Sequence, residues 1–372
     1  MAAITREAPL RRLDWFPADG LDVGIYEEAA KQGKTVSMFL EDLKAQKTET
    51  PYVGMTKAEV LRTRRQMEAA GKAAPLTAFE ECLWAAGIRA FGQHTDVVAK
   101  FFDYSDVDVL FPEFWSDRVA AGMLASSLVP AFVMSENVID ATSYHKLYIE
   151  DSQGDRALAD VVAGEELPET KILVSEKSVV LKKYGRYVTV TYEDIKYQRL
   201  NVFGRALERI GQQIDVDRTD RLFDVLINGD GSQDGAATTV QSGTSGDMDT
   251  TDVINWATCL PTPYKMNAHA GRKAQLKLWY AVLAGFQNPM TTWGFVGITL
   301  PTTHEWDRSV IDSDYLIGVD SRYAVEHLTM GPVLTEVEKL VRRQVQGTAI
   351  SHRDAFAIFD RNAIAIFDGT HA

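Results

Sequence analysis

The segment NGDGSQDG, residues 228–235, contains the residue types of a calcium-binding loop. In the register that starts at Asp230 it offers Ser232 and Asp234, and Ca²⁺ prefers such oxygen ligands. The twelfth position of this register is Gln241, where calcium loops carry a glutamate that binds the ion through both oxygens. The segment is therefore interpreted as an acidic loop, and the sequence predicts neither a metal site nor a cofactor.

Residues that could perform enzymatic chemistry are present without a recognisable arrangement. His304 and Glu305 begin a zinc-protease signature whose second histidine is missing, and no histidine or cysteine pair has zinc-site spacing. His269 and His352 are interpreted as core or surface histidines. The sequence has no GxSxG, Walker A or GxGxxG motif, so we predict no catalytic residues and no enzyme. A soluble α/β enzyme with a Ser/His/Asp group formed by distant residues is the competing class.

The composition is that of an acidic globular protein. Of the 372 residues, 45% are hydrophobic and 24% are charged, which is an ordinary globular balance. A chain of this length can form two or three compact units. The net charge of −13 argues against a protein whose whole surface binds nucleic acid. Cys82 and Cys259 are expected to be free thiols. The N-terminus lacks the apolar stretch of a secretion signal and no apolar run reaches the ~18 residues that span a bilayer, so we expect a soluble protein.

Residues 1–106 are predicted to form an N-terminal helical arm. Two capping boxes predict helix starts: Thr56 with Glu59, and Thr77 with Glu80. A third short helix is expected in SMFLEDLKA. Prolines and glycines separate these helices, which favours an arm laid over a surface; a compact helical domain is the alternative. Residues 107–140 then lead into the core.

Residues 141–190 are predicted to form an extended β loop. The segments 143–150 and 171–192 resemble strands, and the second alternates between two faces over residues 187–192. The 20 residues between them are polar and acidic and include two glycines, too many for a tight hairpin turn. The sequence therefore predicts a long two-stranded excursion with an acidic tip.

Residues 191–228 are predicted to form one long helix. Thr191 is the expected N-cap, and apolar residues recur at a spacing near 3.6 from Ile195 to Ile227. The helix is expected to end before Gly229, which gives about 36 residues and about 54 Å at ~1.5 Å per residue. A break within residues 215–217 is the alternative.

The rest of the chain is predicted to mix helices and strands before it ends in strands. Residues 229–332 are expected to form an α/β domain with a helix in 271–286, and residues 333–372 an all-β segment. The runs 355–359 and 363–367 are apolar on both faces, so we expect them to form a hairpin in a buried sheet.

This order of elements resembles the tailed-bacteriophage major capsid proteins of the Hong Kong 97-type fold. The resemblance covers about residues 107–370, and it is carried by VLKKYGRYVTVTYEDI running into VFGRALERIGQQIDVDRTDRLFDVLINGDG, and by GPVLTEVEKLVRRQVQGTAISHRDAFAIFDRNAIAIFDG. It implies an α+β fold in which 141–190 is the extended loop and 191–228 is the spine helix of a peripheral domain. Residues 229–332 would then be the axial domain, and 333–372 the β segment of the peripheral domain.

The resemblance implies a structural protein that self-assembles through hexamers and pentamers into an icosahedral shell around the double-stranded DNA genome of a tailed phage. Portal and scaffolding proteins are the implied partners, with packaged DNA inside and no membrane. The protein is expected in the virion after assembly in the host cytoplasm. The alternative is an encapsulin-like nanocompartment shell, which shares the fold but which the long N-terminal arm disfavours.

Charged residues of the extended loop are the candidate inter-subunit sites, because each loop is expected to lie across a neighbour. The acidic candidates are Asp151, Asp155, Asp160, Glu165 and Glu166. The basic candidates in the stem are Lys177, Lys182, Lys183 and Arg186. Some relatives cross-link a loop lysine to a neighbour, but residues 151–170 contain no lysine, so we do not expect such a cross-link.

A second candidate surface is basic and lies in the N-terminal arm. Between Lys57 and Lys72 the chain carries five basic residues against two glutamates. Arg62, Arg64 and Arg65 are therefore candidates for facing packaged DNA, which binds basic patches through counterion release. The alternative is a solvated helix face with ion pairs inside the subunit.

Overall fold

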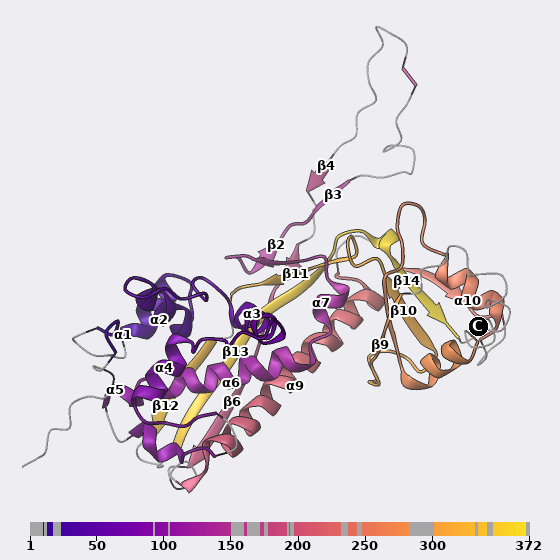
Figure 1. Cartoon of the computed structure of the whole chain (residues 1–372). Helices are drawn as coiled ribbons and strands as arrows, with labels where there is room; N and C mark the ends of the chain where they lie inside the picture. The colour runs from indigo at the N-terminus through magenta and orange to yellow at the C-terminus, as the bar shows by residue number, and fades with distance from the viewer. Residues whose placement is uncertain are drawn as a thin grey trace, which may run out of the picture. The chain divides into compact units, whose positions relative to one another are not determined.

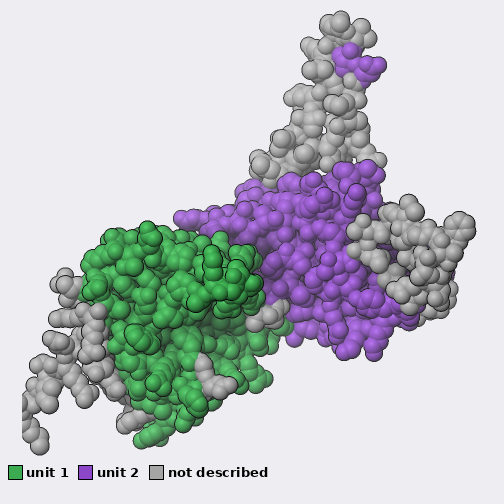
Figure 2. All heavy atoms as spheres, viewed as in Figure 1, with its two compact units in different colours: residues 1–126, 183–216, 331–352 green, residues 127–182, 217–330, 353–372 purple. Residues whose placement is uncertain are grey.

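The structure of the chain is a computed structural model. It describes residues 10, 13–17, 24–91, 94–102, 105–149, 160–161, 172–174, 178–191, 193, 197–231, 237–243, 248–282, 301–331, 334–340 and 345–369. The chain divides into two compact units, which Figure 2 colours separately. Unit 1 comprises residues 1–126, 183–216 and 331–352, and unit 2 comprises residues 127–182, 217–330 and 353–372. Helix α9 (Leu200–Asn228) and strand β13 (Val345–Ile358) contribute residues to both units.

Unit 1 begins with short helices whose starts are set by local sequence. They are α1 (Gly24–Lys31), α2 (Val36–Ala45), α3 (Lys57–Ala69), α4 (Ala78–Ala85), η2 (Val98–Phe102), α5 (Ser105–Asp108) and α6 (Phe111–Ser126). Both predicted capping boxes are confirmed, with Thr56 and Thr77 each accepting from the backbone of the glutamate three residues later. The helix expected in SMFLEDLKA is α2.

The N-terminal helices share one hydrophobic core with α6 and α9. Phe111 and Trp115 of α6 contact Phe203 of α9, with ring centroids 6.1 and 5.0 Å apart. Phe79 of α4 belongs to the same buried cluster. The described part of residues 1–106 is therefore a compact helical region packed within its own chain, which corresponds to the alternative to an extended arm.

Helices α6 and α9 approach each other through glycines. A Cβ atom on Gly122 of α6 would lie 2.1 Å from the carbonyl oxygen of Glu208 in α9. A Cβ atom on Gly211 of α9 would lie 2.1 Å from the carbonyl oxygen of Val119 in α6. Both distances are far below van der Waals contact, so the two backbones touch where no side chain fits.

Buried carboxylates of α6 hold the N-terminal helices. Glu113 accepts hydrogen bonds from the backbone N–H and the hydroxyl of Ser37, at 3.0 and 2.5 Å, in the first turn of α2. Asp117 forms an ion pair with Lys57, the first residue of α3. Helix N-termini favour negative charge, so Glu113 lies where the backbone of α2 stabilises it. Burial nevertheless raises the pKa of Glu113 above its usual value.

A sheet packs against these helices in unit 1. Strand β12 (Leu334–Leu340) pairs antiparallel with β13, and β6 (Lys182–Thr191) also pairs with β13. Val188 and Val190 of β6 pack with Ile350 of β13 against the helical core. The strand expected from the alternation in 182–192 is confirmed.

The long helix starts later than the sequence predicts. Helix α9 has 29 residues, about 44 Å at ~1.5 Å per residue, and begins at Leu200. Thr191 is the last residue of β6, and its predicted role as an N-cap stays a prediction because most of residues 192–196 lie outside the described part of the chain. The first two backbone N–H groups of α9 donate to the carbonyl of Asp96 and the hydroxyl of Thr95, at 2.9 and 3.1 Å. A segment about a hundred residues away therefore sets the helix start.

The end of α9 agrees with the sequence. The helix passes through residues 215–217 without a break and ends at Asn228. Gly229 follows with a φ of 90°, a conformation that glycine adopts without strain.

Unit 2 contains most of the remaining strands. Its further elements are α7 (Val129–Phe132), β1 (Ser135–Val138), β2 (Ser143–Tyr144), β3 (Leu147–Ile149), β4 (Ile172–Val174), β5 (Val179–Val180), β7 (Thr238–Gln241), α10 (Thr250–Ala257), β8 (Ala268–Gly271), β9 (Thr302–Glu305), β10 (Tyr315–Val319), β11 (Val325–Thr329), η4 (Arg361–Ala363) and β14 (Ile364–Asp368). Residues 273–282 are also helical, within the predicted helix 271–286. One sheet has the strand order β7-β14-β10-β8-β9.

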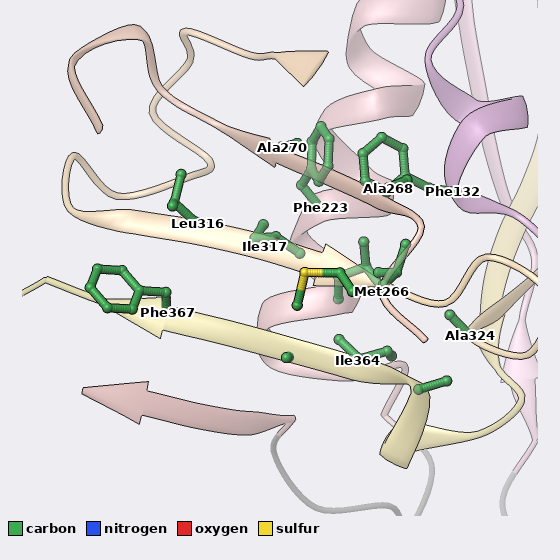
Figure 3. Packing of buried hydrophobic residues seen from close by; sticks show 14 of the residues in the cluster. Phe132, Phe223, Met266, Ala268, Ala270, Leu316, Ile317, Ala324, Ile364 and Phe367 are labelled. Carbon is green, nitrogen blue, oxygen red and sulfur yellow. The ribbon is translucent and has the colours of Figure 1, made fainter. Parts of the chain in front are cut away.

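The core of unit 2 lies on this five-stranded sheet. Figure 3 shows Leu316 and Ile317 on β10 beside Ile364 and Phe367 on β14. On the side of α7 and α9, the rings of Phe132 and Phe223 pack edge to face, with centroids 5.3 Å apart. Apolar side chains from strands and helices that are distant in sequence thus form one cluster.

The prediction that residues 355–359 and 363–367 form a hairpin is wrong. The C-terminal part of β13 pairs with β11, which in turn pairs with β1, whereas β14 pairs with β10 and β7. The short helix η4 separates the two strands, so they enter different sheets. Residues Ile364–Phe367 are buried, as their apolar pattern predicts.

Candidate assembly surfaces

A paired stem extends from unit 2 where the sequence predicts an extended loop. Strand β2 pairs antiparallel with β5, and β3 pairs antiparallel with β4, as Figure 1 shows for the labelled strands. The predicted pairing of the two segments is therefore confirmed for the described residues. Apart from residues 160–161, the acidic tip 151–170 lies outside them.

The structure places part of the charged candidate set. Lys182, Lys183 and Arg186 are exposed along β6, so three cations gather on one strand. Asp160 is exposed as well. The remaining candidates lie outside the described residues: Asp151, Asp155, Glu165, Glu166 and Lys177. Contact between the acidic and basic groups of two subunits stays a prediction.

The sheet of unit 1 has an outer face that the sequence did not reveal. Tyr187 of β6 and Leu334 of β12 are 48% and 51% exposed. A Cβ atom on Gly347 of β13 would lie 1.7 Å from the hydroxyl of Tyr187, so this glycine makes room for the ring. Side chains alternate along a strand, so Tyr187 and Gly347 lie on the face opposite Ile350 and the helical core. A glycine inside a strand pattern was the available signal.

The basic candidates of α3 do not form one free patch. Arg62 and Arg65 are exposed, but Arg64 is half-buried and pairs with Glu80 at 2.7 Å. Lys57, at the start of the helix, is engaged by the buried carboxylate described above. Lys57 and Arg64 therefore form ion pairs within the subunit, which was the alternative to a DNA-facing surface.

An ionic cluster that the sequence did not predict lies in unit 2. The buried carboxylate of Asp354 is 3.2 Å from Arg218 and 3.0 Å from Arg221, both on α9. The ring of His327 stacks on Phe356 and its Nε2 is 3.6 Å from the same carboxylate. The arginines precede the aspartate by more than 130 residues, so no local pattern links them.

The segments considered for metal chemistry have protein partners. Asp230, the first position of the calcium-like register, is 3.4 Å from the Nζ of Lys146 and accepts from the backbone N–H of Ile358 at 2.9 Å. His304 packs its ring against Phe132, with centroids 5.3 Å apart, and burial lowers its pKa. Both groups are explained by packing within unit 2.

Comparison with known proteins assigns the chain to a class and to a family. The sequence model of the family described as phage capsid protein matches residues 175–366, more than half of the chain. The protein is therefore a structural shell protein of the virion and not an enzyme. It belongs to the phage capsid protein family, which confirms the predicted resemblance and the predicted α+β fold class. No curated protein matches the chain.

Solved structures with a similar fold include capsids and a virus-like particle. The capsid of a native GTA particle is 12% identical, with 65% of this chain and 90% of that chain covered and a TM-score of 0.47. A virus-like particle from Pyrococcus furiosus is 12% identical, with 69% and 98% covered and a TM-score of 0.48. The capsid of the cyanophage P-SCSP1u is 11% identical, with 65% and 88% covered and a TM-score of 0.45.

Membership of the phage capsid protein family also bears on the oligomeric state and on the nanocompartment alternative. A capsid consists of many copies of its shell protein, so membership of this family is consistent with a homo-oligomer. The nanocompartment alternative is not favoured, because the matching family is that of phage capsids. Within the described part of the chain, no helix has the length and apolar character needed to cross a membrane.

Proposed function

We propose that the chain is the major capsid protein of a tailed phage, and that it assembles through hexamers and pentamers into an icosahedral shell around double-stranded DNA. Portal and scaffolding proteins are the expected partners, and assembly takes place in the host cytoplasm. The observation that carries the proposal is family membership over residues 175–366. The stem β2–β5 and β3–β4 supports it, because a paired hairpin that leaves its own unit can reach a neighbour.

Electron microscopy of the purified chain, combined with sedimentation over a range of salt concentrations, tests assembly. We expect rings of five and six subunits and closed shells. A monomer under all salt conditions would contradict the proposal. Nuclease-protected DNA in particles from infected cells separates a phage shell from a nanocompartment, which would contain protein instead.

We further propose that the acidic tip of one loop meets the basic strand of a neighbouring subunit. Lys182, Lys183 and Arg186 present three exposed cations, and residues 151–169 carry six carboxylates against one arginine. Charge complementarity of this kind steers docking and fixes register more than it adds affinity. Replacing 153–167 by a short Gly/Ser turn should leave the helical content near normal while shells fail to form.

Charge reversal provides the matched test of this contact. The triple change of Lys182, Lys183 and Arg186 to glutamate should abolish assembly. Subunits with that change and lysines at Asp155, Glu165 and Glu166 should assemble again. Normal shells from the triple variant alone would exclude the contact.

For Arg62 and Arg65 we propose a DNA-facing role, which is supported by their exposure on α3. Each phosphate contact would release counterions, so genome retention should become more sensitive to salt when both are changed to glutamate. Lys31, an exposed lysine at the end of α1, is the matched control. Unchanged retention at every salt concentration would refute the role.

A further inference from the structure

A buried ion pair lies at the base of the projecting hairpin. Lys146 is the residue immediately before β3, and its Nζ is 3.4 Å from Oδ2 of Asp230. The two side chains are only 5% and 1% exposed. Asp230 follows shortly after the end of α9, so the pair joins the hairpin to the segment that leaves the long helix.

Both charged groups also bind the backbone of the same residue. The Nζ of Lys146 donates to the carbonyl oxygen of Ile358 at 3.0 Å, and the N–H of Ile358 donates to Asp230 at 2.9 Å. Ile358 is the last residue of β13. An ion pair and two hydrogen bonds therefore join three segments that are distant in sequence. Hydrogen bonds are directional, so they restrain how these segments are oriented.

The hairpin is anchored up to this point. Val179 and Leu181, on its returning side, pack with Leu328 and Ala357 in a small apolar cluster. Tyr144 of β2 donates to Glu326 at 3.4 Å. Beyond Lys146, the strands β3 and β4 pair with each other. Lys146 thus marks the boundary between the anchored base and the projecting part.

A buried ion pair is a poor source of stability, because desolvation of two charges offsets most of their attraction. Hydrogen bonds to both the N–H and the carbonyl of one residue are satisfied in one orientation only. The pair is therefore suited to fix direction.

We propose that Lys146 is a positioning residue, anchored by Asp230 and Ile358, that fixes the direction in which the hairpin leaves unit 2. Its importance for a shell rests on the proposed function, in which the loop crosses a neighbouring subunit. The direction itself is a property of the single subunit and can be measured without assembly.

The test uses the full chain, dilute and monomeric, with spin labels on Asp160→Cys and Thr251→Cys. Both positions are exposed, the first in the hairpin and the second on α10 of unit 2. Cys259, which is half-buried, is changed to serine, while Cys82 is buried and remains. The distance distribution between the labels is compared in the parent, Lys146→Met, Asp230→Asn and the double variant.

The double variant decides the question. It leaves no unpaired buried charge, and the asparagine introduced by Asp230→Asn would still accept from Ile358, so its unfolding midpoint should stay near that of the parent. Its distance distribution should nevertheless broaden about twofold or divide into two populations. The half-exposed pair Lys34 and Asp42, changed to methionine and asparagine, is the control and should change nothing.

A double variant with the parent's distance distribution would overturn the proposal, and so would broadening that only follows a loss of stability. Shell formation by the parent is measured separately. If the parent does not form shells, the proposed function fails while the label distances still decide the role of Lys146.

Discussion

Buried carboxylates in the two units, Glu113 and Glu41 in unit 1 and Asp354 in unit 2, have different kinds of partner. In unit 1 two buried carboxylates accept hydrogen bonds from the backbone at helix starts: the N–H groups of Ser37 and Ala78 donate to Glu113 and Glu41, at the starts of α2 and α4. In unit 2 the buried carboxylate of Asp354 instead lies beside the side chains of two arginines of α9. The two kinds of partner differ in what remains paired when the carboxylate side chain is replaced.

A carboxylate at a helix N-terminus is held by groups that every residue possesses. An amide can replace it, because the backbone N–H donates to any suitably placed oxygen. A carboxylate between arginines has no such substitute, since its removal leaves like charges buried together. Replacement of Asp354 should therefore destabilise the chain more than replacement of Glu113 by glutamine.

The largest expected effect is the replacement of Asp354 by alanine. Removing one partner of a buried ionic cluster costs about 3–5 kcal/mol, because Arg218 and Arg221 would lose the buried carboxylate beside them. Chemical unfolding of the chain measures this loss. Asp42→Ala, at the half-exposed pair with Lys34, should cost less than about 1 kcal/mol. Equal losses from both variants would show that burial of the ionic cluster does not raise the cost of losing one partner.

A second effect depends on pH and concerns His269 of β8. The ring is fully buried between Trp256 and Trp279, and neither nitrogen has a hydrogen-bond partner among the described residues. Burial, with a smaller contribution from His304, lowers the pKa of His269 to about 4. The unfolded chain therefore takes up this proton first as the pH falls below about 6.5.

The stability of unit 2 should accordingly be complete above pH 6.5 and decline toward pH 4, by up to about 3 kcal/mol for this group. His269→Phe should remove that part of the pH dependence while the stability at pH 7.5 changes little in comparison. Unfolding curves collected across this range provide the measurement. An unchanged slope in the variant would show that other groups cause the acid lability.

The third effect tests the backbone contact of unit 1. Gly122→Ala would place a methyl group 2.1 Å from the carbonyl oxygen of Glu208, so α6 and α9 must separate, at a cost of about 1–3 kcal/mol. Gly204→Ala is the matched control on α9, because its nearest neighbour is the flexible side chain of Arg118 at 3.4 Å. This control should be neutral or stabilise the helix by up to about 1 kcal/mol. Thermal unfolding of both variants gives the comparison.

The smallest effect is expected for Glu113→Gln. Burial raises the pKa of Glu113, so the folded chain holds this proton more strongly than the unfolded chain. Its contribution to stability is thus greatest below the usual pKa of 4.5 and is lost as the pH rises through the raised value, opposite in sign to His269. Glutamine still accepts from Ser37, so the variant should fold and lose only this slope. A loss as large as that of Asp354→Ala would show that the carboxylate charge itself is required.

Local sequence determined the features that depend on residues within a few positions of one another. The capping boxes at Thr56 and Thr77 and the end of α9 before Gly229 are of this kind. So are the alternation of β6 and the two segments that pair as the hairpin stem, because strand pattern and turn composition are written along the chain. The acidic and basic runs of the loop were also visible in the sequence, and the structure adds that Lys182, Lys183 and Arg186 are exposed.

Tertiary structure decided what depends on partners far along the chain. The start of α9 was missed because Thr95 and Asp96 satisfy its first N–H groups. Strands β13 and β14 enter different sheets because their partners, β11 and β10, compete successfully with a local hairpin. The buried pair of Lys146 and Asp230 was equally invisible, since 84 residues separate its members. Hydrogen-bond partners and desolvation are properties of the folded neighbourhood, and no short stretch of sequence contains that neighbourhood.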